Sequence, residues 1–202
     1  MAKRDTLLDS KIVTSAKREF LIHGYQNASL HKIAKNAQVT TGALYTRYDN
    51  KDDLFKCIVK DALLECTDQF IEVQTKYIYA KEQRDLNAFL EALTFESNVY
   101  LNLFDTHHDA CVLLFCKSDG SSLGSSLFQG IAFKTQEIAA YFESISHQQV
   151  NTQAIEALMY MQFYAFRNVL EQGLPPDQAS EAMRSIFSFF NAGWKELFSQ
   201  YL

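Results

Sequence analysis

Apolar residues recur at intervals of three and four over most of the chain. Near the N-terminus, Ile12, Ala16 and Phe20 follow this spacing, which places them on one face of a helix running to about His23. Alternation of apolar and polar residues with a period of two, which would predict strands, is absent over most of the length. The two prolines are adjacent, so they interrupt the pattern once. The sequence predicts an all-α protein of about nine helices.

Capping residues place the helix boundaries. Gly24 follows the first helix where a left-handed C-terminal cap is expected. Ser29 and Thr40 are the expected N-caps of the next two helices, and Asn50 with Asp53 forms a near capping box at the fourth. The predicted helical stretches are about Thr6 or Ser10 to His23, Leu30–Ala37, Thr40–Tyr48, Asn50 to beyond Tyr77, Leu86–Phe104, Asp109–Cys116, Leu127–Ser146, Thr152–Gln172 and Asp177–Tyr201.

One segment between these stretches reads KSDGSSLGSS, residues 117–126, and half of it is serine. It does not end in Gly-Lys-Ser or Gly-Lys-Thr, so it does not have the pattern of a nucleotide-binding loop. A serine- and glycine-rich connection of this kind predicts a mobile linker.

Two short helices near the N-terminus, joined by a tight turn, have the pattern of a helix-turn-helix. The second helix of such a motif enters the DNA major groove with its N-terminal end, where large side chains would hold its backbone away from the bases. Its front is small and polar here, while Leu44 and Tyr48 lie four residues apart and are expected to face the other two helices. The motif predicts a double-stranded DNA partner.

Charge is distributed unevenly along the chain. Residues 1–50 carry eight basic and four acidic side chains, a net charge of +4, which leaves −9 on the remainder of a chain whose total is −5. A basic head on an acidic body is expected when one end of a protein meets a polyanion.

The segment SAKREFLIHGYQNASLHKIAKNAQVTTGALYTRYDNKDDLF resembles the DNA-binding domain of TetR-family transcription regulators, and the resemblance extends over about Ser10 to Ile58. It implies a helix-turn-helix domain at 1–50 and a helical effector-binding and dimerisation domain at 51–202. It also implies a cytoplasmic homodimer, most simply a repressor that an effector releases from a palindromic operator, with no enzymatic activity and no cofactor. Three positions depart from the family pattern: Gln38 replaces a usual glycine, Thr41 a common lysine and Asp49 a frequent proline.

The residues expected to meet DNA belong to the second helix of the motif and its flanks. A threonine can contact a base edge or a phosphate. Lys51 lies in the first turn of a helix, against the helix dipole, which a phosphate partner would explain. The expected DNA-binding residues are Ser29, Lys32, Thr40, Thr41, Gly42, Ala43, Tyr45, Thr46, Arg47 and Lys51.

The remaining helices carry many aromatic residues at helical spacing. Most aromatic residues in such a pattern form the core, but some are expected to line a pocket for an apolar or aromatic effector. The candidate pocket residues are Phe89, Phe95, Tyr100, Phe104, Phe115 and Phe128.

The last two predicted helices are apolar around most of their circumference, so they require cover on more than one side. In TetR-family regulators the corresponding helices pack against their copies, and two reading heads on a two-fold axis match a near-palindromic site. The expected dimer-interface residues are Phe163, Phe166, Leu170, Met183, Ile186, Phe190, Trp194 and Leu197.

Other chemistries find little support in the sequence. His107 and His108 are adjacent and match no zinc spacing, and the four cysteines match no disulfide or metal pattern, so metal or redox sensing stays open as an alternative. The longest apolar run, residues 110–116, is far below the roughly 20 residues that span a bilayer, and the N-terminus lacks an apolar signal core. We therefore expect a cytoplasmic protein with no membrane partner.

Two rival functions have the same fold. One is a helical small-molecule-binding protein or enzyme that retains the fold without binding an operator, although no nucleophile–base pattern is present. The other is an architectural DNA-binding protein with no sequence preference, which the net charge of −5 disfavours. A gel shift that compares DNA from upstream of the gene with random DNA separates all three functions.

Overall fold

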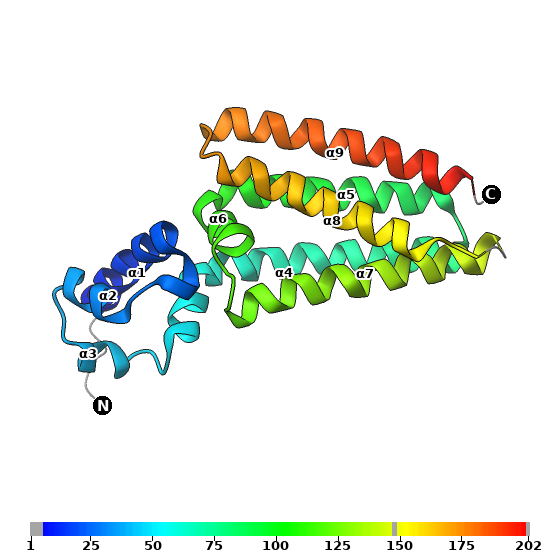
Figure 1. The fold of residues 1–202 in the computed structure, drawn as a ribbon. Coiled ribbons are helices and arrows are strands. Elements are labelled where there is room, and N and C mark those ends of the chain that lie inside the picture. The colour runs from blue at the N-terminus through cyan, green and yellow to red at the C-terminus, as the bar shows by residue number, and fades with distance from the viewer. Residues whose placement is uncertain (1–5, 147–148, 201–202) are drawn as a thin grey trace. The chain divides into compact units, whose positions relative to one another are not determined.

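The computed structural model describes residues 6–146 and 149–200, and its regular structure there is entirely helical, as the sequence predicts (Figure 1). The predicted end of the last stretch at Tyr201 lies outside the described residues. The helices are α1 (Thr6–Asn27), α2 (Leu30–Asn36), α3 (Thr41–Tyr45), α4 (Lys51–Gln83), α5 (Leu86–Thr106), α6 (His108–Cys116), α7 (Ser122–Ser146), α8 (Thr152–Glu171) and α9 (Pro176–Ser199).

The chain forms two compact units. The first comprises Met1–Leu63 together with Asp109–Ser126, and the second comprises Leu64–His108 together with Leu127–Leu202. Helices α4, α6 and α7 therefore contribute residues to both units. The first unit contains the predicted DNA-binding segment 1–50 and, in addition, the start of α4, most of α6 and the start of α7.

The core of the first unit is built on the predicted apolar face of α1. Ile12, Ala16 and Phe20 are fully buried, and the Phe20 ring packs edge-on against Phe55 of α4, with their centroids 5.1 Å apart. Gly24 has φ 71, a left-handed value that glycine adopts without strain, and it breaks the regular geometry of α1 as its capping position predicts. These contacts hold α1 and α4 as the support for the two short helices.

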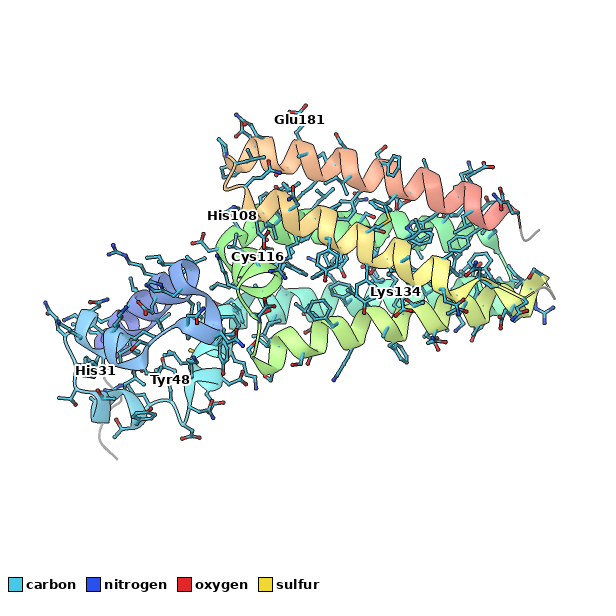
Figure 2. All side chains as sticks on the ribbon, viewed as in Figure 1. His31, Tyr48, His108, Cys116, Lys134 and Glu181 are labelled. Carbon is cyan, nitrogen blue, oxygen red and sulfur yellow. The ribbon has the colours of Figure 1, made fainter. Side chains whose placement is uncertain are left out.

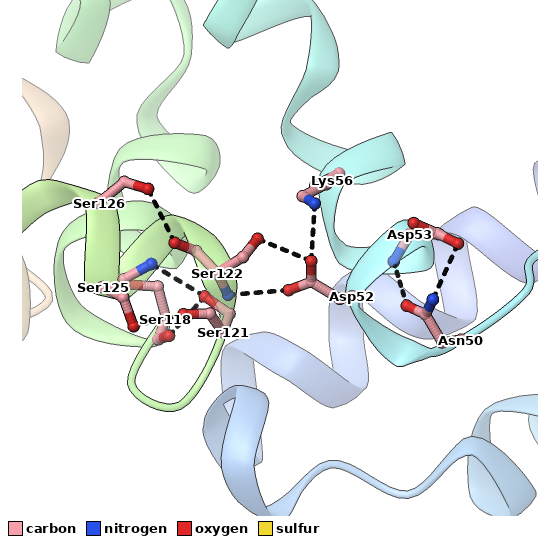
Figure 3. Close-up of polar contacts among 10 residues, drawn as sticks. Asn50, Asp52, Asp53, Lys56, Ser118, Ser121, Ser122, Ser125 and Ser126 are labelled. Carbon is pink, nitrogen blue, oxygen red and sulfur yellow. Dashed lines mark hydrogen bonds and ion pairs between the residues drawn. The ribbon is translucent and has the colours of Figure 1, made fainter.

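The predicted mobile linker is wrong, because its second half forms the first turn of α7. Ser121 caps this helix by accepting the Gly124 N–H at 3.0 Å. Asp52 of α4 accepts the N–H of Ser122 at 3.0 Å and its hydroxyl at 2.7 Å (Figure 3). Serine and glycine do not prevent a helical start when hydroxyls and a carboxylate satisfy its first N–H groups.

The Asp52 carboxylate is held by a second partner. Lys56, one turn along α4, approaches it to 2.8 Å. Burial alone would raise the pKa of Asp52, but the hydrogen bonds from Lys56 and Ser122 outweigh that effect and hold the pKa below its ordinary value. Asp52 is therefore a carboxylate at neutral pH and an acceptor for the N-terminus of α7.

Within the first unit, α1 has further contacts with α6 and with the residue that follows it. The Tyr25 N–H donates to the Lys117 carbonyl at 2.7 Å, and Lys17 of α1 forms an ion pair with Asp109 of α6 at 2.7 Å. A backbone contact and a side-chain contact therefore join α1 to residues that are far from it in sequence.

The second unit contains most of α4, α5, α7, α8 and α9. Helix α9 packs against α5 and α8, and α8 and α9 lie side by side in Figure 1. The Phe142 ring of α7 stacks on Phe198 of α9 with a centroid distance of 3.9 Å, and Trp194 stacks on the same Phe198 at 5.4 Å. All three residues are buried, so the apolar periodicity of α7 and α9 is satisfied largely within the chain.

Gly124→Ala tests the packing at the start of α7. A Cβ at Gly124 would overlap the Ser118 carbonyl, which is backbone and cannot move aside cheaply. We expect a loss of about 1–3 kcal/mol of unfolding free energy, measured by urea denaturation. Gly130→Ala in the same helix is the matched control, because a Cβ there meets nothing within 4 Å. It should stabilise the protein by up to ~1 kcal/mol, and an equal gain at both positions would contradict the packing described.

Candidate nucleic-acid interface and the interior of the helical unit

Helices α2 and α3 form the predicted helix-turn-helix, and both predicted N-caps are confirmed. The Ser29 hydroxyl accepts the Lys32 N–H at 3.3 Å, and the Thr40 hydroxyl accepts the Ala43 N–H at 3.0 Å. The predicted capping box is also present, since Asn50 accepts the Asp53 N–H at 2.9 Å and donates to the Asp53 carboxylate at 3.0 Å (Figure 3). Each short helix therefore has a side-chain acceptor for an N–H group that would otherwise lack one.

The turn between α2 and α3 contains a strained residue. Gln38 has φ 59, a left-handed value that costs a residue with a Cβ of order 1 kcal/mol or more. In the family pattern that the sequence resembles, this position is usually glycine. The turn therefore keeps a left-handed φ at this position although glycine, the residue best suited to that φ, is absent.

Helix α3 presents a buried rear and an exposed front. Leu44 is completely buried and Tyr48 is 6% exposed, which confirms that they face the unit's core. Gly42 and Thr46 are exposed on the other side, and the Tyr45 side chain is 50% exposed. Helix α3 as observed ends at Tyr45, three residues earlier than predicted, because Thr46 is its C-cap. The front of α3 is therefore small, polar and open to a large partner.

The surroundings of Gly42 leave room for a side chain. A Cβ built on Gly42 would find the Thr40 hydroxyl at 3.8 Å as its nearest neighbour, an ordinary van der Waals distance. The residue also lacks the left-handed φ that would require glycine. Neither packing within the chain nor backbone conformation therefore requires glycine at this position.

Several predicted DNA-binding side chains are already engaged within the first unit. Arg47 donates to Asp9 of α1 at 2.7 Å and to the Ala43 carbonyl at 3.1 Å. The Lys51 ammonium donates to the carbonyls of Gln26 and Ala28 at 3.1 and 3.3 Å. Lys51 thus caps carbonyl groups at the end of α1, a structural role that the sequence interpretation did not include.

The remaining predicted residues are available to different degrees. Lys32 and Thr40 are exposed, whereas Ser29, Thr41 and Ala43 are half-buried. Sequence reasoning missed His31 of α2, whose Nδ1 lies 3.5 Å from the Thr41 hydroxyl on the same surface (Figure 2 labels His31). The exposed residues His31, Lys32, Gly42, Tyr45 and Thr46 make up the α3 surface.

The six candidate effector-pocket residues are divided between the two units. Phe115 belongs to the first unit and the other five to the second. Phe89 packs with Tyr77 and Tyr141 at centroid distances of 5.2 and 4.8 Å. The other candidates have separate contacts: Tyr100 with Phe70, Phe166 and Phe187, Phe104 with His108, Phe128 with Phe163, and Phe95 with the Lys76 ammonium.

Most residues predicted at the dimer interface are buried inside the single chain. Phe166, Leu170, Met183, Phe190 and Trp194 belong to its core, and Phe163, Ile186 and Leu197 are half-buried. The periodicity of α8 and α9 correctly marked apolar faces, but it did not separate the face covered by α5 from the face left open. The large apolar side chains exposed on these helices are Met161, Tyr164 and Phe189.

Sequence reasoning also missed a polar cluster inside the second unit. Glu96 of α5 is 7% exposed, accepts the Tyr77 hydroxyl at 2.7 Å and forms an ion pair with Lys134 of α7. Burial, together with the adjacent Glu96, raises the pKa of Tyr77 well above its ordinary value, so its hydroxyl remains a donor. The signal was present, because Glu96 and Lys134 occupy positions that the apolar spacing of their helices assigns to the core.

A second buried polar group lies near this cluster. The Tyr141 hydroxyl is buried and has no hydrogen-bond partner among the described residues. Its pKa is raised by burial and by Asp85. The Tyr141 ring stacks on Phe89, which in turn contacts Tyr77, so the two polar groups share an aromatic neighbour.

The residues considered for metal or redox sensing have other surroundings. His107 contacts Glu65 at 2.7 Å, and the His108 ring packs edge-on against Phe104 at 5.0 Å. Within residues 6–146 and 149–200, no group of three or more potential ligand residues is arranged to hold a metal ion. Cys57 is exposed, Cys111 and Cys116 are buried, and the Cys66 side chain lies outside the described residues.

The helix-turn-helix with its exposed α3 front, attached to a larger helical unit, defines a DNA-binding protein. Residues 12–58 match the family model described as "Bacterial regulatory proteins, tetR family". This chain therefore contains a DNA-binding segment of the kind found in TetR-family regulators. No curated protein sequence matches it.

Solved structures share the fold over nearly the whole chain. A TetR-like transcriptional regulator from Rhodococcus sp. RHA1 is 17% identical, with 95% of this chain and 99% of that chain covered and a TM-score of 0.58. FadR from Bacillus subtilis, in complex with stearoyl-CoA, is 14% identical over 92% and 98% of the chains, with a TM-score of 0.57. FadR from Bacillus halodurans is 15% identical over 92% and 98%, with a TM-score of 0.53. At these identities the likeness establishes the fold. Every helix in the described residues is too short or too polar to cross a membrane.

Gln38→Gly tests the strain in the turn. Glycine adopts φ 59 without the steric cost that glutamine bears, so we expect the unfolding free energy to rise by about 1 kcal/mol. Thermal and urea denaturation measure the gain. Gln38→Ala keeps a Cβ at the same φ and is the control, for which no comparable gain is expected. A Gln38→Gly variant no more stable than Gln38→Ala would place the turn in another conformation.

Proposed function

We propose that the protein is a homodimeric repressor that binds a near-palindromic operator and leaves it when a small-molecule effector binds the helical unit. The observation that carries the DNA-binding role is the front of α3: exposed, small at Gly42, and backed by the buried Leu44. A helix held from behind, with nothing bulky in front, suits entry into a major groove. Because the operator belongs to chromosomal DNA, the protein acts in the cytoplasm.

Three side chains on this surface supply contacts of different kinds. Tyr45 extends from α3 and can donate its exposed hydroxyl to a base or a phosphate. Thr46, the C-cap of α3, donates its hydroxyl to the Ala43 carbonyl at 2.8 Å and offers DNA its methyl group and an acceptor oxygen. Lys32 of α2 is exposed and has a charge suited to a phosphate. Arg47 and Lys51 act chiefly by fixing α3 and the end of α1, because their polar atoms already have partners within the unit.

The effector role is supported by the interior of the second unit. It contains a large aromatic set around Phe89 and a buried polar cluster at Glu96, a combination that can bind an amphipathic molecule. The B. subtilis FadR structure contains stearoyl-CoA, so this fold accommodates an apolar ligand in at least one related architecture. Effector binding would favour a conformation with lower operator affinity.

The dimer role is supported by exposed apolar side chains on the last two helices. Met161 and Tyr164 are 57% and 51% exposed on α8, and Phe189 is 72% exposed on α9. Ala192 and Gly193, one turn after Phe189, are exposed as well and allow another helix to approach closely. We therefore assign the interface to this face in place of the residues buried in the chain's core.

Gly42→Leu tests the reading helix. The chain has room for the side chain, so the variant should fold, but the leucine would stand between the α3 backbone and the groove. We expect affinity for DNA taken from upstream of the gene to fall at least several-fold, measured by fluorescence anisotropy at one stated salt concentration. Gly42→Ala is the control and should lose less affinity while melting at the same or a higher temperature. Undiminished binding by folded Gly42→Leu would show that this face does not enter the groove.

Phe189→Glu tests the dimer. A charge placed at the centre of an apolar interface loses its hydration without gaining a partner, so we expect a monomer at concentrations where the parent is a dimer. Sedimentation velocity measures the change. Ile71→Glu is the matched control, since Ile71 on α4 is also highly exposed, at 61%. Dissociation by Ile71→Glu and not by Phe189→Glu would move the interface to α4.

A further inference from the structure

The polar cluster inside the second unit is organised around one carboxylate oxygen. Tyr77 and Lys134 both donate to Oε2 of Glu96, which leaves Oε1 without a hydrogen bond among the described residues. The Lys134 ammonium also lies 5.1 Å from the centroid of the Tyr77 ring, on which it makes a cation–π contact. A carboxylate, a phenol and an aromatic face therefore surround a single ammonium group.

The anion and the cation of this pair are held very differently. The Glu96 side chain is 10% exposed and is fixed by the Tyr77 hydroxyl, whereas the Lys134 side chain is 24% exposed and ends a flexible four-carbon stem. Figure 2 labels Lys134 on α7. A buried carboxylate that loses its partner is strongly unfavourable, so Glu96 must always have a cation. The Lys134 ammonium, however, can move into solvent, where water hydrates its charge.

We propose that Glu96 and Tyr77 form a receptor for the ammonium group of a lipophilic amine, and that Lys134 occupies this receptor when the amine is absent. This inference names the effector class and rests on the proposed function for its regulatory meaning. The amine ammonium takes both Glu96 oxygens and the Tyr77 ring face, and its apolar body takes the place of the Lys134 stem. Lys134 then moves into solvent.

An amine suits this receptor better than an anion or a neutral molecule. Exchange of one ammonium for another keeps the buried charge balanced, so the apolar body of the ligand decides the affinity. An anion would compete with Glu96 for Lys134 and leave the buried carboxylate unpaired. A neutral alcohol cannot replace the cation. Because Lys134 is tethered at an effective concentration of millimolar or more, a ligand must be more apolar than the lysine stem to displace it.

The first experiment uses three probes of the same length and different charge: n-hexylammonium, hexanoate and hexanol. Each is added to the unmodified protein without DNA, and the melting temperature is compared with that in an equal concentration of sodium chloride. A ligand that binds the folded state raises the melting temperature in proportion to its occupancy. We expect a rise with n-hexylammonium alone. A rise with hexanoate or hexanol, or none with any probe, would overturn the proposal.

The second experiment removes the internal competitor. Lys134→Ala leaves Glu96 unpaired, so this variant should melt lower than the parent and recover with n-butylammonium. This probe has the lost ammonium on an apolar stem one carbon longer than the three methylenes that the substitution removes. Sodium butyrate and butanol are the controls. We expect Lys134→Ala to bind n-hexylammonium at least tenfold more tightly than the parent by isothermal titration calorimetry. Equal affinities would show that Lys134 does not occupy the amine site and would overturn the proposal.

A charge-neutral variant keeps the test decisive if Lys134→Ala does not fold. Glu96→Gln preserves size and hydrogen bonding but removes the charge that holds the ammonium. We expect it to lose the melting shift with n-hexylammonium, and a retained shift would overturn the assignment of Glu96. Amine binding is measured without DNA, so its failure beside intact operator binding rejects this inference alone. Amine binding by a protein that binds no operator rejects the proposed function alone.

Discussion

The α3 surface depends on a helix that is not stable in isolation. Helix α3 is five residues long, too short to form in isolation, because the cost of nucleation exceeds what its few hydrogen bonds return. It exists because Leu44 is buried against the rest of the unit and Thr40 satisfies one of its first N–H groups. The exposed front of α3 thus depends on the buried residues behind it, which include residues of α1 and α4.

Polar contacts between distant segments complete this support. Asp52, in the first turn of α4, accepts two hydrogen bonds from Ser122 at the N-terminus of α7, although the two residues are 70 positions apart in sequence. Such a contact is hard to see in a single sequence, because nothing in KSDGSSLGSS indicates where its acceptor lies. The composition of this segment predicted a flexible linker. In the structure, hydrogen bonds to the Asp52 carboxylate help to hold its second half as the start of α7.

The sequence predicted best the features that depend on residues close together in the chain, such as helix caps and the buried face of a helix. The caps at Ser29 and Thr40, the break at Gly24 and the buried face of α1 follow from local spacing, and the structure has all of them. The sequence could not show which element covers each apolar helix face. Phe190 and Trp194 were expected at a dimer interface because a helix pattern shows that a face is apolar and not whether α5 or a second copy covers it. The carbonyl partners of Lys51 were not predicted for the same reason, since they lie 23 and 25 residues away in sequence.

Lys51 and Lys134 show why equal geometry does not imply equal function. Each ammonium lies near the face of a tyrosine ring, 4.7 Å from Tyr25 for Lys51 and 5.1 Å from Tyr77 for Lys134. The oxygens that complete the two sites differ. Lys51 meets neutral carbonyls, which water can hydrate if the lysine leaves, so the chain does not require a cation there. Lys134 meets a buried carboxylate, which does require one. Only the second site makes exchange with an outside cation energetically reasonable, because the demand for a positive charge persists when the lysine moves away.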